Sequence, residues 1–115
     1  MYLGLELGTS GVKALLIDDR QHVIGSAHGN LDVLRPHPSR SEQDPAHWIQ
    51  ACEAAIDDLR AAHPKEFSAI SGIGLPGQMY GATLLDENDQ LPRPCILWND
   101  TRSHKGAAEL SPLAE

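Results

Sequence analysis

Residues 2–17 read YLGLELGTSGVKALLI, and this stretch decides the fold. It contains two apolar runs, Tyr2 to Leu7 and Val12 to Ile17, separated by the turn Gly8-Thr9-Ser10-Gly11. Short apolar runs bounded by glycine-rich turns are typical of β-strands. The stretch therefore predicts two neighbouring antiparallel strands joined by a tight turn.

A third strand is expected directly after this pair. Asp18-Asp19-Arg20 turns the chain again, and Gln21 to Leu31 follows with a higher content of His and Ser. Polar residues of this kind are tolerated best at the edge of a sheet. Three consecutive strands with tight turns indicate an antiparallel meander.

Farther along the chain, a helix and more short strands are expected. Arg35 to Arg40 predicts an extended loop, because each of its prolines lacks a backbone donor. Asp44-Pro45 is a strong helix start, and Pro64 stops the helix. Its apolar stripe consists of Trp48, Cys52, Ala55, Ile56 and Leu59. Three later strands are predicted, at Ser68 to Leu75, Ala82 to Leu85 and Cys95 to Trp98. The order predicts an α/β fold with a mixed sheet and at least one packed helix.

Composition limits the possible classes of protein. The chain has 115 residues, 41% of them apolar, which suits one globular domain. Its formal net charge of −7 argues against a broad surface for nucleic acids or anionic membranes. The sequence contains no secretory signal and no apolar run long enough to span a membrane. Cys52 and Cys95 are expected to be unpaired thiols in a reducing compartment, which predicts a cytoplasmic protein.

The first candidate for chemistry is the turn Gly8-Thr9-Ser10-Gly11, with Lys13 beyond it. A tight glycine turn leaves backbone N–H groups pointing outward, and two hydroxyls add donors, so phosphate oxygens could bind there. Taken alone, the local sequence favours a plain hairpin turn instead. It matches neither a Walker loop nor a dinucleotide-binding motif.

The second candidate is the loop from Gly77 to Gly81, which presents an amide, backbone groups and a phenol after a predicted buried strand. In α/β proteins, groups that contact ligands gather at such strand ends. In the competing interpretation, Met79 and Trp98 belong to the core, and Asn99-Asp100 forms a turn or helix cap. The six histidines and two cysteines show no metal-ligand spacing, so no zinc site built by the protein is predicted.

Five collinear stretches connect the chain to a known family. Residues Leu3 to Lys13 resemble the first phosphate loop of the superfamily of sugar kinases, Hsp70 and actin. The other four follow the order seen in bacterial xylulokinases, members of the FGGY family of carbohydrate kinases. They are Arg35-Pro36-His37-Pro38, Ser41-Glu42-Gln43-Asp44-Pro45, Gly77-Gln78-Met79-Tyr80-Gly81-Ala82-Thr83-Leu84-Leu85-Asp86 and Ile96-Leu97-Trp98-Asn99-Asp100.

The resemblance implies a ribonuclease-H-like (actin-like ATPase) fold. It also implies transfer of the ATP γ-phosphoryl group to D-xylulose, giving D-xylulose 5-phosphate, with ATP and Mg²⁺ as cofactors. The residues that would face the triphosphate are Gly8, Thr9, Ser10, Gly11 and Lys13, and Glu6 would organise the metal through water. The residues that would contact the sugar are Gln78, Met79, Tyr80, Trp98 and Asp100. No residue is expected to bind the metal directly.

Two positions depart from the family's pattern. Glu6 stands where the first strand normally carries Asp, and Tyr80 stands where xylulokinases commonly have His. Family members run to several hundred residues, with the second phosphate loop, the adenosine site and the general-base Asp downstream. We therefore expect residues 1–115 to be a partial N-terminal kinase domain, inactive alone and able to self-associate through an uncovered sheet face. The alternatives are a non-catalytic binding or assembly module, and a kinase acting on ribulose, gluconate or glycerol.

Overall fold

The computed structural model describes residues 1–113, which form two compact units. Unit 1 comprises residues 1–32 and 45–78, and unit 2 comprises residues 33–44 and those from 79 onward. Unit 1 contains strands β1 (Tyr2–Leu7), β2 (Gly11–Ile17), β3 (Val23–Asn30) and β5 (Gly72–Gly74), with helices α1 (Pro45–Ala62) and α2 (Pro64–Ser68).

The sheet of unit 1 has the strand order β3-β2-β1-β5. β1 pairs with β2 and β2 pairs with β3 in antiparallel fashion, whereas β1 and β5 are parallel. The predicted meander and the predicted mixed sheet are therefore confirmed. Because side chains alternate across a strand, Leu3 and Leu5 point to one face together with their register partners Leu16 and Ala14.

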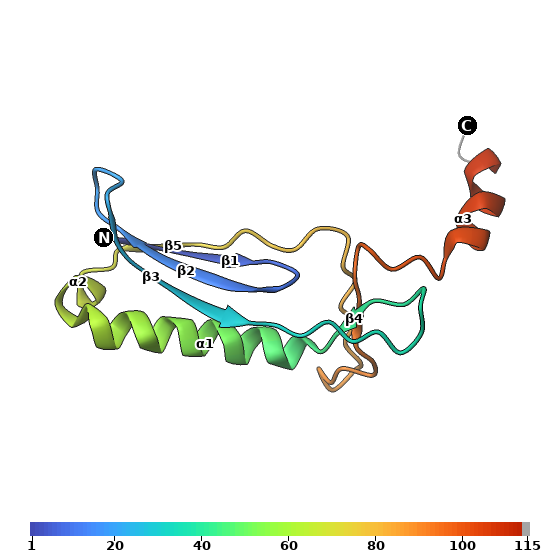
Figure 1. Ribbon diagram of the computed structural model, residues 1–115, viewed down its shortest axis with the longest axis horizontal. Coiled ribbons are helices and arrows are strands. Elements are labelled where there is room, and N and C mark those ends of the chain that lie inside the picture. Colours follow the sequence, from blue (N-terminus) through green and yellow to red (C-terminus); the bar gives the residue numbers. More distant parts are fainter. Residues whose placement is uncertain (114–115) are drawn as a thin grey trace. The chain divides into compact units, whose positions relative to one another are not determined.

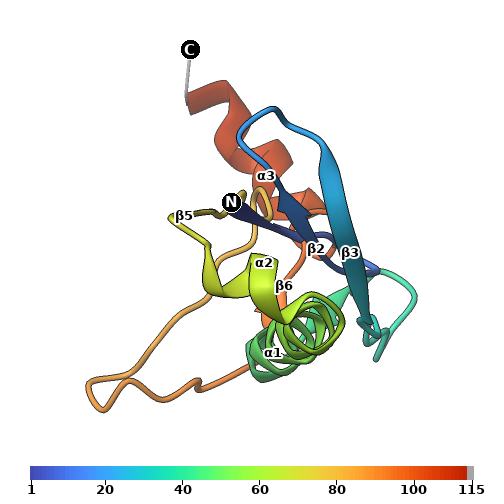
Figure 2. The same cartoon turned by 90° about the vertical axis from the view of Figure 1, so that its left-hand side faces the viewer.

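Helix α1 covers that apolar face, as Figures 1 and 2 show. Its residues Ala51, Ala55 and Leu59 are buried, and Trp48, Cys52 and Ile56 are partly buried beside them, so the predicted stripe is confirmed. A Cβ on Gly29 of β3 would lie 2.7 Å from the carbonyl oxygen of Ala51. The helix therefore approaches β3 to a distance that only glycine allows.

The opposite face of the sheet carries Tyr2, Gly4, Leu15 and Ile17, and these residues line shallow apolar hollows between β1, β2 and β5. Both helices of unit 1 pack against the other face, since Phe67 and Ile70, which belong to and follow α2, join the same core as Leu59. Self-association through this face stays a prediction.

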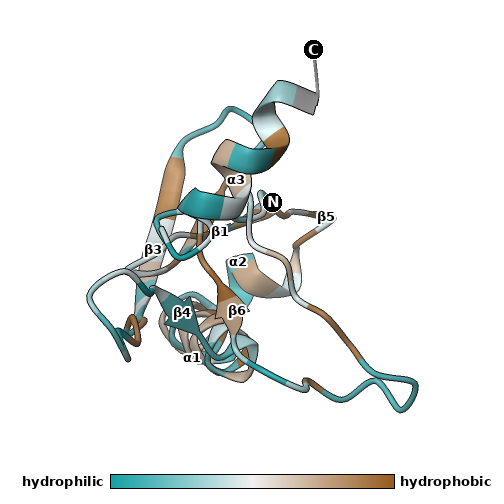
Figure 3. Ribbon diagram, turned by 90° about the vertical axis from the view of Figure 1, so that its right-hand side faces the viewer, coloured by the Kyte–Doolittle hydropathy of each residue, from teal (hydrophilic) through white to brown (hydrophobic). Residues whose placement is uncertain are grey.

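Unit 2 is built on very short strands. β4 (Glu42–Gln43) pairs with β6 (Cys95–Ile96), and single bridges join Leu34 to Glu42 and Ala82 to Ile96. Figure 3 shows the polar β4 in teal beside the apolar β6 in brown. Helix α3 (His104–Leu110) and a 3₁₀ turn (Ser111–Leu113) follow.

Three predicted strands need correction. The strand expected over Ser68 to Leu75 is confined to Gly72–Gly74, because Pro64 starts the additional helix α2, which extends to Ser68. The strand expected over Ala82 to Leu85 is wrong: only Ala82 forms a bridge, and Leu84 and Leu85 are exposed. The strand expected over Cys95 to Trp98 ends at Ile96, where the chain enters a turn.

The two cysteines are free, as predicted. Cys95 is buried, and partial burial raises the pKa of the Cys52 thiol, so neither side chain resembles an activated nucleophile. Within residues 1–113, no helix is long and apolar enough to cross a bilayer, and no three His, Cys, Asp or Glu side chains gather as a metal site.

Leu59 provides a test of this core. Leu59→Ala should lower the free energy of unfolding by about 2–5 kcal/mol, because it removes buried methyl groups and leaves a cavity between α1 and the sheet. Urea denaturation followed by circular dichroism measures the change. Ile49→Ala is the matched control, since Ile49 lies on the same helix and is 61% exposed; its effect should stay within about 0.5 kcal/mol. Equal effects at the two positions would contradict the packing described here.

Candidate active site

The turn between β1 and β2 is tight, and backbone hydrogen bonds within it and from the residue after β3 hold it in place. The N–H of Gly8 donates to the carbonyl oxygen of Gly11 at 2.9 Å, and the N–H of Leu31, beyond β3, donates to the carbonyl oxygen of Ser10 at 3.1 Å. A Cβ on Gly11 would lie 2.6 Å from the carbonyl oxygen of Gly29. Backbone atoms therefore fix this turn, and glycine is needed where it meets β3.

Beside the turn lies an open cavity of about 310 Å³. Its lining includes most of the residues predicted to face a triphosphate, together with two polar residues of β3. The lining residues are Glu6, Gly8, Ser10, Gly11, Val12, Lys13, His28, Gly29 and Asn30. The structure thus brings Glu6, the turn and Lys13 to one place.

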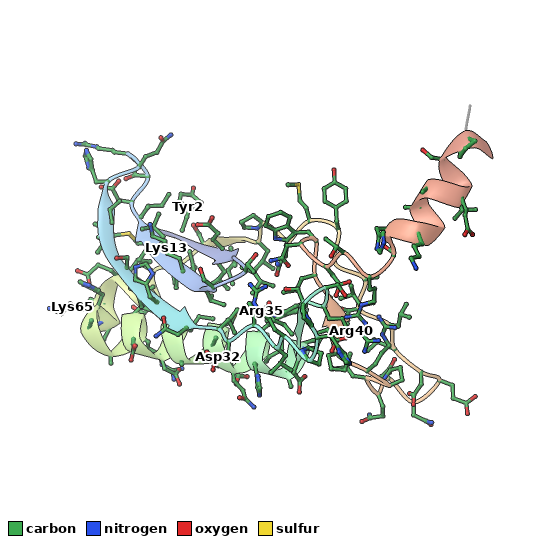
Figure 4. All side chains as sticks on the ribbon, turned by 45° about the vertical axis from the view of Figure 1, so that its right-hand side comes forward. Tyr2, Lys13, Asp32, Arg35, Arg40 and Lys65 are labelled. Atoms are coloured by element: carbon green, nitrogen blue, oxygen red, sulfur yellow. The ribbon has the colours of Figure 1, made fainter. Side chains whose placement is uncertain are left out.

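Three ionisable side chains form a row across the sheet at this cavity. Glu6 of β1 is the register partner of Lys13 of β2, and Lys13 is the register partner of His28 of β3. All three are exposed on the face opposite α1, where Figure 4 labels Lys13. The sequence did not point to His28, because its spacing from the other histidines matches no metal-ligand pattern. The register of the predicted meander is the signal that finds it.

The arrangement suits an anion accompanied by a divalent cation. The Lys13 ammonium and the Ser10 hydroxyl can donate to phosphate oxygens, whereas the nearby Glu6 carboxylate repels them. A cation between the carboxylate and the phosphate removes that repulsion, and Mg²⁺ prefers oxygen ligands of this type, many of them water. The residues present therefore fit magnesium bound through water near Glu6.

Gln78 lies beside the same turn. Its Nε2 donates to the Thr9 hydroxyl oxygen at 3.1 Å, and its Oε1 is buried with no hydrogen-bond partner among the described residues. The sequence placed Gln78 with the residues that contact the sugar, but the structure connects it to the candidate phosphate turn. The carboxamide oxygen is an unused acceptor at this point.

Unit 2 carries the remaining predicted residues. Met79, Tyr80 and Trp98 are 71%, 88% and 60% exposed, so the interpretation of Met79 and Trp98 as core residues is wrong. Tyr80 has a φ of 57°, a left-handed conformation that is uncommon for a bulky residue and is often found at functional sites. These side chains are available to a ligand.

Asp100, in contrast, is almost fully covered, with a side chain only 1% exposed. Its carboxylate accepts hydrogen bonds from the N–H of Ser41 at 2.7 Å and from Nη2 of Arg102 at 2.6 Å, and also from Nε and the N–H of Arg102. Arg102 Nη2 also donates to Glu42. The Arg102 guanidinium holds the pKa of the Asp100 carboxyl well below its usual range, and the same contacts raise the pKa of Arg102.

The family follows from a comparison of the whole chain with known domains. Residues 1–114 match the model for the N-terminal domain of the FGGY family of carbohydrate kinases. The chain belongs to this family. The predicted ribonuclease-H-like (actin-like ATPase) fold is confirmed with it, since FGGY kinases are also the structural neighbours of this chain.

Individual relatives within the FGGY family are xylulose kinases. The curated xylulose kinase of Klebsiella pneumoniae is 50% identical over 102 residues, which are 89% of this chain and 21% of that protein. The crystal structure of a xylulose kinase from Brucella ovis shares 72% identity with a TM-score of 0.95, covering 98% of this chain and 24% of the other. The xylulose kinase structure from Rhodospirillum rubrum shares 29% identity with a TM-score of 0.91, covering 96% and 23%. The chain spans about a fifth of the length of the curated relatives it matches.

The depressed pKa of Asp100 predicts how the stability of unit 2 of this FGGY domain depends on pH. A carboxyl with a lower pKa in the folded state stabilises that state above its unfolded pKa of about 3.9, and this stabilisation is lost as the pH falls through the folded pKa. The stability advantage of the unaltered chain over Asp100→Asn should therefore be complete at pH 6 and should shrink below about pH 4. Urea denaturation monitored by Trp98 fluorescence, in a Trp48→Phe background, measures it.

The matched control for this prediction is Asp57→Asn, because Asp57 forms an ion pair with Arg60 in which both side chains are 62% exposed. That control should change stability little at either pH, since exposed pairs contribute little. A difference between the unaltered chain and Asp100→Asn that stays constant from pH 6 to pH 3 would show that the Asp100 charge does not stabilise unit 2.

Proposed function

We propose that this FGGY domain serves a kinase that transfers the γ-phosphoryl group of ATP to a hydroxyl of D-xylulose. The observation that supports the sugar most strongly is the 72% identity, over 98% of the chain, to the Brucella ovis xylulose kinase. The cavity beside the Gly8–Gly11 turn supports the phosphate part of the proposal, because it combines backbone donors, a hydroxyl and a cation.

In this proposal, unit 1 handles the phosphates. The N–H groups of Thr9, Ser10 and Gly11 and the hydroxyls of Thr9 and Ser10 orient phosphate oxygens, and Lys13 offsets their charge. Phosphoryl transfer depends mainly on such positioning and charge neutralisation. Magnesium bound with ATP supplies further charge neutralisation, and Glu6 orients its water shell.

Unit 2 and Gln78 serve the sugar in the same proposal. The exposed Met79 and Trp98 offer apolar surfaces for the carbon face of a ketose, and the Tyr80 hydroxyl offers a donor or acceptor for its hydroxyls. Gln78 contributes a carboxamide oxygen that no described residue uses. The carboxylate base for the attacking hydroxyl has no candidate among these residues.

The proposal is tested with two proteins. One is the 115-residue chain, and the other is a hybrid in which this chain replaces the matching segment of the Brucella ovis kinase. The hybrid should form D-xylulose 5-phosphate with magnesium and ATP, and the chain alone should show no turnover, since no described residue is a candidate for the carboxylate base. A coupled ADP assay measures both. If the hybrid preferred ribulose, gluconate or glycerol, the substrate would be that compound and not D-xylulose. If it phosphorylated none of these compounds, a binding module would be favoured.

Glu6 gives a sharper test of the phosphate site. In the hybrid, Glu6→Asp should raise kcat about tenfold or more, because Glu6 carries its carboxylate about 1.5 Å farther out than the usual Asp and would orient the metal's water shell less accurately. Steady-state kinetics at saturating magnesium and ATP measure kcat. Glu53→Asp, on the exposed side of α1, is the matched control and should leave kcat unchanged. Equal kcat values for the unaltered hybrid and its Glu6→Asp variant would show that this position does not organise the metal.

A further inference from the structure

Residues 97–100 form a tight turn in unit 2, and Trp98 and Asn99 are its two central residues. The N–H of Asp100 donates to the carbonyl oxygen of Leu97 at 3.1 Å, which closes the turn. Leu97 is buried, whereas Trp98 is 60% exposed. The turn therefore exposes the Trp98 indole while Leu97, its first residue, stays buried.

Both ends of this turn are bonded to the segment Ser39–Glu42. At the start, the N–H of Leu97 donates to the carbonyl oxygen of Ser41 at 2.9 Å. At the end, the Asp100 carboxylate accepts from the N–H of Ser41 at 2.7 Å, and the next N–H, of Thr101, donates to the carbonyl oxygen of Ser39 at 2.9 Å. Ser41 thus contacts both ends of the turn through its own backbone.

Arg102 completes the arrangement as a fork between two carboxylates. Its guanidinium donates to both oxygens of Asp100 and to Oε1 of Glu42, which lies in β4. Only arginine presents planar donors that can bond two carboxylates at once. Because the Asp100 side chain is 1% exposed and the Glu42 side chain is 17% exposed, these bonds are largely shielded from water.

We propose that Asp100 and Arg102 are positioning residues, which with Glu42 form a clamp that fixes the Leu97–Asp100 turn and presents Trp98 to the sugar. Asp100 then acts through Trp98 and does not accept hydrogen bonds from the sugar itself. The role assigned to Trp98 rests on the proposed kinase function, but the clamp is a property of unit 2 alone.

The first experiment uses the 115-residue chain without any ligand. The chain contains two tryptophans, so Trp48→Phe leaves Trp98 as the only indole. In that background, Asp100→Asn and Arg102→Gln should lower the fluorescence anisotropy of Trp98 and increase its quenching by acrylamide. Arg102→Lys should behave like Arg102→Gln, since an ammonium keeps the charge but not the fork.

Matched variants separate the clamp from a general loss of structure. Arg60→Gln removes an arginine from an exposed ion pair on α1 and should leave the Trp98 signals unchanged. Glu42→Gln neutralises only one partner of Arg102. It should therefore change the Trp98 signals in the same direction but by less, even where the Asp100 and Arg102 variants unfold unit 2. The double variant Asp100→Asn/Arg102→Gln should change the Trp98 signals no more than Arg102→Gln alone, because both residues belong to one interaction.

The second experiment measures kinetics in the hybrid kinase. Asp100→Asn and Arg102→Gln should each raise the KM for D-xylulose by a similar factor, about tenfold, while the KM for ATP stays within about twofold. Arg60→Gln should leave both values unchanged. Indirect positioning predicts that both variants raise this KM by a similar factor. No sugar contact is proposed for Arg102, so its effect must be indirect.

The outcomes separate the clamp from the proposed function. A raised xylulose KM in Asp100→Asn, with an unchanged Trp98 signal and an unaffected Arg102→Gln variant, would make Asp100 a direct ligand and overturn the clamp. Unchanged Trp98 signals in Asp100→Asn, Arg102→Gln and Arg102→Lys together would overturn it as well. An inactive hybrid would count against the kinase function, and the Trp98 measurements on the chain would still decide whether the clamp exists.

Discussion

Close contact between backbones at two glycines is the constraint on which unit 1 depends. A Cβ on Gly11 would come within 2.6 Å of the carbonyl oxygen of Gly29, and a Cβ on Gly29 would come within 2.7 Å of the carbonyl oxygen of Ala51. Backbone atoms at the end of the Gly8–Gly11 turn therefore lie close to β3, and those of β3 lie close to α1. Because backbone atoms cannot rotate away as side chains do, the turn is held by the core itself, which suits a site that must be preorganised.

The same sheet explains why the ionisable groups meet at one end. The antiparallel register aligns Glu6, Lys13 and His28 on the face away from α1, while Leu5 and Ala14 lie on the face that α1 covers. The alternation that builds the core thus also builds the polar row, since neighbouring residues point to opposite faces. The polar row beside the Gly8–Gly11 turn therefore follows from the strand pattern.

The parts of the fold that sequence could predict are those with strong local signals. The meander and α1 show long apolar periodicity, a cap and prolines, and both were found in their correct places. The strands β4 and β6 contain two residues each and exist only because distant segments pair, so no local pattern marks them. The apolar run Ala82 to Leu85 looked like a strand but has no neighbouring strand to bond beyond one bridge.

The candidate site also contains features that local sequence predicts and features that it does not. The exposure of Met79 and Tyr80 follows from nearby sequence, because both lie in a loop that Gly77 and Gly81 predict, whereas Trp98 was expected to end a strand. The burial of Asp100 does not, since it depends on Ser41, which is far away along the chain, and on which way Arg102 turns.

The two units therefore hold their candidate ligand groups by different physical means. In unit 1, the shape of the Gly8–Gly11 turn results from steric contact and backbone hydrogen bonds, which do not change with protonation. In unit 2, the Leu97–Asp100 turn is tied to Ser39–Glu42 through a network centred on one carboxylate and one guanidinium. Such a network is worth most when every partner is present, because removing Arg102 leaves the Asp100 carboxylate buried without its guanidinium partner. The geometry around Trp98 is thus sensitive to substitution of a charged side chain, whereas the Gly8–Gly11 turn is sensitive to substitution of Gly11 or Gly29.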